Sequence, residues 1–166
     1  KFRESGPSIV NLLPNQPNKI ILSFNPGGAS GRLSKVNRAF LPRSYHKFDI
    51  ETGKKSLMIK GKPSMGQVRF NADGEAWTAQ GFDAGKDEYV WYFRQTKEDG
   101  KWEEIYRQHE DSFENFSIRG FDENNPDIIF VVAHNGSDKT ALWEFNVRSK
   151  TFDEIIYARP DVNVGG

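Results

Sequence analysis

The feature that most constrains the fold is a pattern that recurs three times along the chain. Each time, a turn residue precedes an extended apolar or alternating segment, and a pair of further extended segments follows. The central segments begin at Asn18, Asp73 and Pro126, and the pairs that follow place Phe48, Phe93 and Phe145 at equivalent positions, 45 and 52 residues apart. A period of this length is typical of repeated structural units that stack on one another.

Each pair of segments is joined by a short connection with the residues of a hairpin. The first two connections, Glu51–Lys54 and Lys97–Gly100, contain a glycine that can adopt positive φ, whereas the third, Arg148–Thr151, has none. The segments Ile9–Leu13, Gln67–Asn71 and Phe116–Phe121 lead the three repeats and complete four strands in each. No window has the apolar periodicity of a helix beyond one turn.

Four antiparallel strands repeated at this period predict an all-β chain, a partial β-propeller of about three four-stranded antiparallel blades. We expect the blades at about 8–61, 66–108 and 115–158, in a single propeller fragment that spans residues 1–166. The alternative is an antiparallel sandwich, which would not need the same order of turn, strand and hairpin three times.

Three blades of a propeller leave two apolar sheet faces without partners, because such rings usually close with four to eight blades. We therefore expect self-association of the chain made alone, and two copies would supply the blades of a six-bladed ring. The chain begins at Lys1 without an initiator methionine, and we interpret this residue as a cut end.

Charge and composition exclude several functional classes. Lysine and arginine number 23 and aspartate and glutamate also number 23, so no net field attracts nucleic acid or an anionic membrane. Without cysteine there is no disulfide, thiolate nucleophile or zinc–thiolate site. The apolar runs are far shorter than the roughly 18 residues of a membrane span, which predicts a soluble chain, cytoplasmic or periplasmic.

The last part of the chain resembles a known family. The stretches from Ala141 to Asn146 and from Ala158 to Gly166, which ends Asp-Val-Asn-Val-Gly-Gly, are similar to the amino-terminal propeller of prolyl oligopeptidase family serine peptidases. The sequence of the hairpin Asp49–Lys54 is also similar to a hairpin of that family, although this sequence is common among propellers. The resemblance covers nearly the whole chain and is most specific in its last 45 residues.

The resemblance implies a role without catalysis in this chain. In that family the propeller lies over an α/β-hydrolase domain and controls which peptides reach its catalytic triad. The expected partners are therefore the remainder of the propeller, that hydrolase domain and a peptide substrate of the parent protein. A nucleophile elbow needs Gly-x-Ser-x-Gly, and the nearest sequence, Gly28–Arg32, has arginine at the second glycine. A ligand- or protein-binding scaffold propeller with no peptidase attached is the alternative.

A basic segment is the most individual feature of the chain. Residues 26–48 contain no acidic residue and include five cations, which are Arg32, Lys35, Arg38, Arg43 and Lys47. We interpret them as a possible interaction loop for a catalytic domain, a second subunit or an acidic peptide, against the alternative of a solvated insertion. Nucleic acid is excluded, because the chain is neutral overall and the loop has few aromatic residues.

The remaining polar and aromatic residues predict no catalytic, cofactor or metal site. The three histidines His46, His109 and His134 share no metal-ligand spacing, and Asp122–Asp127 lacks the glycine and the final glutamate of a calcium loop. The acidic pairs Glu103–Glu104 and Glu110–Asp111 are expected to be solvating charges. The aromatic residues Trp77, Trp91, Tyr92, Trp102 and Trp143 are expected to pack between blades rather than form a sugar or peptide platform.

Overall fold

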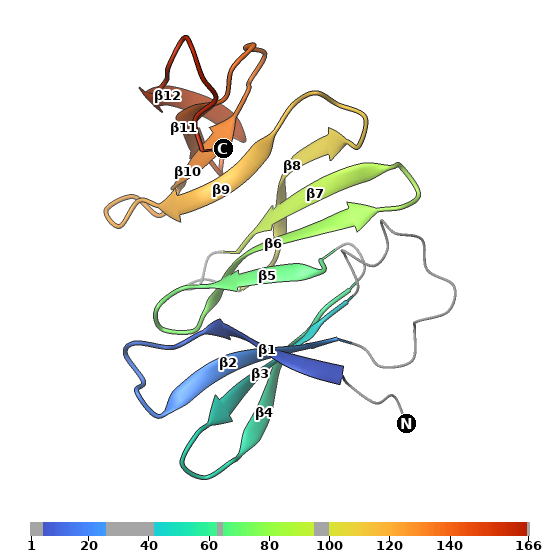
Figure 1. Ribbon diagram of the computed structural model, residues 1–166, viewed down its shortest axis with the longest axis vertical. Coiled ribbons are helices and arrows are strands. Elements are labelled where there is room, and N and C mark those ends of the chain that lie inside the picture. The colour runs from blue at the N-terminus through green and yellow to red at the C-terminus, as the bar shows by residue number, and fades with distance from the viewer. Residues whose placement is uncertain (1–4, 26–41, 63–64, 95–99, 166) are drawn as a thin grey trace. The chain divides into compact units, whose positions relative to one another are not determined.

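The computed structural model describes residues 5–25, 42–62, 65–94 and 100–165. These residues form three four-stranded antiparallel sheets, and no helix occurs among them. Within every sheet the strands neighbour one another in chain order, as Figure 1 shows. The predicted all-β class, with three four-stranded antiparallel sheets, is confirmed, and this strand order is consistent with a partial propeller-like fold.

The twelve strands follow the three repeats. Sheet 1 contains β1 (Ser5–Asn11), β2 (Lys19–Asn25), β3 (Ser44–Asp49) and β4 (Lys55–Lys60). Sheet 2 contains β5 (Gln67–Phe70), β6 (Ala76–Asp83), β7 (Glu88–Phe93) and β8 (Glu103–His109). Sheet 3 contains β9 (Phe116–Phe121), β10 (Ile128–Ala133), β11 (Ala141–Asn146) and β12 (Thr151–Tyr157). The chain divides into two compact units, residues 1–107 and residues 108–166.

In the first unit, sheets 1 and 2 share a hydrophobic core. Sheet 1 and the turn that follows β1 contribute Leu13, Ile21 and Tyr45, while sheet 2 contributes Val68 and two alanines, Ala76 and Ala79. All six residues are buried. The small alanines of β6 leave room for the larger side chains of sheet 1, so that the two faces interdigitate.

Two polar side chains of sheet 1 also bind the main chain of sheet 2. The hydroxyl of Tyr45 donates a hydrogen bond to the carbonyl of Gly66 at 3.1 Å and accepts one from the amide of Val68 at 2.8 Å. Asn11 Nδ2 donates to the carbonyls of Phe70 and Asn71 at 3.2 and 3.0 Å. Tyr45 is 1% exposed, so its two hydrogen bonds satisfy main-chain groups that water does not reach.

The first strand ends earlier than the sequence predicts. We expected Ile9–Leu13 to be extended, but β1 ends at Asn11 and Leu13 lies in a turn with a φ of 49°. Asn11 Oδ1 accepts a hydrogen bond from the amide of Leu13 at 2.7 Å, which stabilises this turn. The Leu13 side chain thereby enters the core, where it is fully buried.

The hairpin without glycine has the same geometry as one that contains it. In the β3–β4 connection, Asp49 Oδ1 accepts hydrogen bonds from the amides of Glu51 and Thr52, and Gly53 adopts a φ of 68°. In the β11–β12 connection, the equivalent acceptor is Asn146 Oδ1, and Lys150 adopts a φ of 60°. An acceptor side chain at the end of the strand holds both turns, and lysine takes the position of glycine in the second.

In the second unit, sheet 3 has an aromatic cluster on one face. Phe116, Phe145 and Phe152 contact one another edge to face, with ring centroids 5.1 to 6.0 Å apart. Trp143 packs on Phe152 at 5.6 Å, and its indole nitrogen donates to the carbonyl of Ala133. These residues lie on three different strands and hold the sheet together across its width.

Candidate functional site

The predicted interaction loop lies only partly in the region that the structure describes. Arg32, Lys35 and Arg38 lie outside the described residues. Arg43 precedes β3 and its carbonyl accepts a hydrogen bond from the amide of Gly61 at 2.8 Å. Lys47 lies in β3, and its ammonium donates to Gln16 Oε1 at 3.3 Å.

Lys47 belongs to a basic hollow at the hairpin end of sheet 1. This hollow has a volume of about 430 Å³, and its lining residues are Lys19, Lys47, Asp49, Lys54, Lys55 and Ser56. Sequence reasoning missed three of the four lysines, because they enter the hollow only when β2, β3 and β4 pair. The observed register places Lys19 beside Asp49 and Lys47 beside Ser56.

The acidic residue of this hollow is engaged by the neighbouring turn. The hydrogen bond from the Thr52 amide lowers the pKa of the Asp49 carboxyl, and the amide of Glu51 and the charge of Lys19 act in the same direction. Asp49 therefore stays ionised, with its charge directed to the hairpin amides. The four lysines outnumber this carboxylate, so the hollow is cationic.

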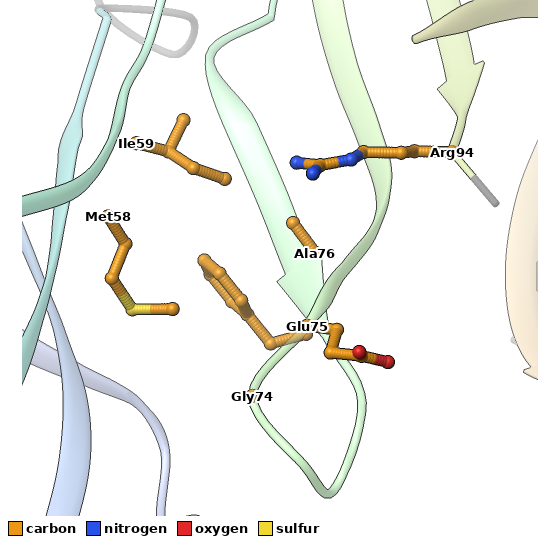
Figure 2. Close-up of a pocket in the computed structure, with 7 residues that line it drawn as sticks. Met58, Ile59, Gly74, Glu75, Ala76 and Arg94 are labelled. Carbon is orange, nitrogen blue, oxygen red and sulfur yellow. The ribbon is translucent and has the colours of Figure 1, made fainter. Parts of the chain in front are cut away.

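A second pocket lies between sheets 1 and 2 and has a volume of about 310 Å³ (Figure 2). Met58 and Ile59 of β4 form one wall, and Phe70 and Ala76 of sheet 2 contribute further apolar surface. Figure 2 shows the guanidinium of Arg94, which follows β7, directed into the space between these residues. Gly74 and Glu75 complete the lining.

The guanidinium of Arg94 forms no hydrogen bond or ion pair with any residue that the structure describes. Its Nε atom is buried, and its Cζ lies 5.9 Å from the centroid of the Trp102 ring, within cation–π range. A Cβ atom at Gly100 would lie 2.7 Å from one terminal nitrogen of Arg94, so glycine lets the main chain approach the guanidinium. Sequence analysis did not predict this site, since Arg94 follows an alternating strand like any solvated arginine.

The charges around Arg107 form a different kind of cluster, in which the arginine is fully paired. Its terminal nitrogens contact Asp83 at 3.0 Å, Glu88 at 2.7 Å and Glu104 at 2.7 Å. The hydrogen bonds that Arg107 donates to Glu104 and Glu88 raise the pKa of Arg107, and the hydrogen bond that it donates to Asp83 lowers the pKa of that carboxyl. We expected Glu104 to be a solvating charge, but it pairs within β8 with Arg107, and Arg107 in turn joins β8 to Asp83 of β6 and Glu88 of β7.

The aromatic and histidine residues do not converge on one surface. Trp91 is buried, Tyr92 and Trp102 pack against the core of the first unit, and Trp143 belongs to the cluster of sheet 3. His46 packs edge to face on Phe24, and His134 packs on Phe113. Tyr92 and Trp102 thus pack on the core that sheets 1 and 2 share, whereas the contacts of Trp143 lie within its own sheet.

The described parts of the chain contain no group of three or more histidine, cysteine or acidic residues that could hold a metal ion. The acidic stretch after β9 forms a turn, in which Asp122 Oδ1 accepts hydrogen bonds from the amides of Asn124 and Asn125. The stretch Gly28–Arg32 lies outside the described residues. Within the described residues, no helix is long and apolar enough to cross a bilayer.

Comparisons of the chain with protein-family models, with curated proteins and with solved structures find no match.

Proposed function

We propose that this chain is a non-catalytic propeller segment of a prolyl oligopeptidase-like serine peptidase, which contributes substrate gating and contacts with other domains or subunits. Its partners would be the remaining blades, an α/β-hydrolase domain and the peptide substrate of the parent. The resemblance of the closing stretch Ala158–Gly166 supports this kinship. The repeated order of four strands in each sheet supports the blade interpretation.

The observation that carries the proposal is the outer face of sheet 1. The register aligns Ile9, Leu22, His46 and Leu57 in one row across the four strands, on the face opposite the shared core. The two ends of this row are open to solvent, with Ile9 61% and Leu57 59% exposed. These apolar side chains, with the buried His46 between Leu22 and Leu57, are suited to packing on another four-stranded sheet, because the inner face of sheet 1 packs on sheet 2 in this way.

Self-association tests the proposal. We expect the chain alone to form a dimer at micromolar concentration in sedimentation velocity, because a second copy supplies the missing sheet. The double variant Ile9→Ser, Leu57→Ser is expected to weaken the dimer at least tenfold. Val162→Ser, which changes a residue of the second unit that is 47% exposed, is the matched control and should leave the dimer intact.

A strictly monomeric wild-type chain would overturn the self-association. A dimer that survives the double variant would show that another surface is used. The peptidase kinship is tested separately by the coding sequence that follows Gly166. Further blades and a Gly-x-Ser-x-Gly elbow support it, whereas an unrelated module contradicts it.

The basic hollow favours a second candidate, a scaffold propeller that binds an acidic protein or peptide. Four lysines and one carboxylate line a volume of about 430 Å³ at the surface of sheet 1. The same downstream sequence separates the two candidates, because a scaffold would lack the hydrolase domain.

A further inference from the structure

The pocket between sheets 1 and 2 contains a cation, Arg94, that pairs with no acidic residue in the part of the chain that the structure describes. A guanidinium is charged at every physiological pH and carries five N–H donors. Arg94 is partly buried, yet none of these donors meets an acceptor among the described residues. A charge removed from water is costly unless it is paired, so this guanidinium would be stabilised by an anion.

The carboxylate of Glu75, which also lines the pocket, does not supply that anion. Glu75 is exposed, and its Oε2 accepts a hydrogen bond from Asn71 Nδ2 at 3.1 Å. Figure 2 shows the Glu75 carboxylate directed away from the guanidinium. As far as the described residues go, the pocket therefore combines a guanidinium that has no acceptor with a carboxylate at its rim, and that carboxylate would repel a polyanion.

The apolar lining and the volume of the pocket indicate what the rest of the ligand is. Met58, Ile59, Phe70 and Ala76 present thioether, aliphatic and aromatic surface in the same pocket. A volume of about 310 Å³ is near the lower end for ligand pockets, which limits the occupant to a small group. One negative charge and one compact apolar group fit both features.

The guanidinium is held in place by its surroundings. Its Cζ lies 5.9 Å from the Trp102 ring centroid, which provides a cation–π contact. This contact orients the plane of the guanidinium and leaves its N–H groups available as donors. Gly100 packs so closely that a Cβ atom would lie 2.7 Å from a terminal nitrogen. A preorganised guanidinium can form paired hydrogen bonds with a carboxylate, whereas an ammonium acts as a point charge.

We propose that this pocket binds a carboxylate that carries a short branched apolar group, with Arg94 pairing with the carboxylate and Met58, Ile59 and Phe70 enclosing the apolar group. Two sources share this chemistry, a free carboxylic acid and the carboxyl-terminal residue of a peptide. The site lies wholly within the first unit, and it does not depend on the propeller's parent protein.

The experiment titrates three probes into the whole chain and follows the indole N–H of Trp102 by NMR. The probes are 4-methylpentanoate, N-acetyl-alanyl-leucine and its carboxamide. We expect one or both acids to bind with a dissociation constant on the order of 1 mM or tighter and the carboxamide to bind at least tenfold more weakly. Binding of the free acid alone identifies a small-acid site, and binding of the dipeptide acid identifies a peptide terminus.

Variants separate pairing from folding. Arg94→Gln is expected to weaken binding of the acid about tenfold or more, and Arg94→Lys is expected to weaken it less. Glu75→Gln is expected to tighten binding of the acid, because it removes the repulsion between two negative charges. Arg159→Gln is the matched control, since Arg159 pairs with Asp161 in the second unit. The proposal would be overturned if the acid and the carboxamide bound with equal affinity, or if neither acid bound. It would also be overturned if Arg94→Gln kept native chemical shifts and bound the acid as tightly as the wild type.

Discussion

Tyr45 shows how a single hydroxyl joins two sheets. It donates to the carbonyl of Gly66 and accepts from the amide of Val68, and its ring packs on Phe70 with centroids 5.3 Å apart. Burial raises the pKa of this phenol, so it stays protonated and able to donate. The ring and the hydroxyl of Tyr45 therefore both stabilise the contact between sheets 1 and 2.

Removal of that hydroxyl gives a stability test. Tyr45→Phe keeps the ring but leaves the carbonyl of Gly66 and the amide of Val68 without their partner in a buried site. We expect a loss of about 1–3 kcal/mol in the free energy of unfolding. Urea unfolding followed by tryptophan fluorescence measures it, with Tyr157→Phe as the control because Tyr157 is 51% exposed. A loss as small as that of the control would refute a stabilising role.

At the scale of elements, the strands were predictable because each repeat has a turn residue, an alternating segment and a hairpin. The hairpin without glycine was the weakest part of that prediction, yet Asn146 provides the acceptor that Asp49 provides in the first repeat. The end of β1 was not predictable from alternation alone. Leu13 continues the apolar pattern, but the hydrogen bond from its amide to Asn11 turns the chain there.

The ion cluster of sheet 2 gives a prediction about pH. The hydrogen bond from Arg107 lowers the pKa of Asp83, so the carboxylate is more acidic in the folded chain than in the unfolded chain. Its contribution to stability is therefore present above the ordinary pKa of a carboxyl and is lost as the pH falls through the lowered value. Between pH 7 and about pH 3, the stability difference between wild type and Arg107→Gln should shrink.

Carboxyl NMR can follow the same titration directly. The midpoint of Asp83 should lie below its ordinary value in the wild type and return towards it in Arg107→Gln. Arg159→Gln should leave it unchanged, since Arg159 contacts Asp161. An Asp83 midpoint that does not respond to Arg107→Gln would contradict the assigned cause.

At the scale of the whole molecule, the two units differ in what they bury. The first contains two sheets with a shared core, whereas the second contains one sheet with its aromatic cluster. A single sheet of this size has little surface to bury by itself. Apart from Lys47, the residues of the candidate sites were not predictable from sequence, because Arg94 and the other lysines of the basic hollow acquire their neighbours only through strand pairing and sheet packing.

Separate production of the two units tests this difference. Residues 1–107 are expected to unfold cooperatively in urea, while residues 108–166 alone should give poorly dispersed NMR spectra and no cooperative transition. The intact chain serves as the reference for both. Cooperative unfolding of residues 108–166 alone would show that sheet 3 suffices for a stable fold.

The contacts that Tyr45 and Asn11 make with sheet 2 also bear on aggregation. The β5 strand is the terminal strand of its sheet, and such strands recruit other chains through unused amides and carbonyls. Here the amide of Val68 is occupied by Tyr45, and the carbonyls of Phe70 and Asn71 are occupied by Asn11. The interactions that join the two sheets thus also deny β5 to intruding strands, protecting the chain against fibril growth at that position.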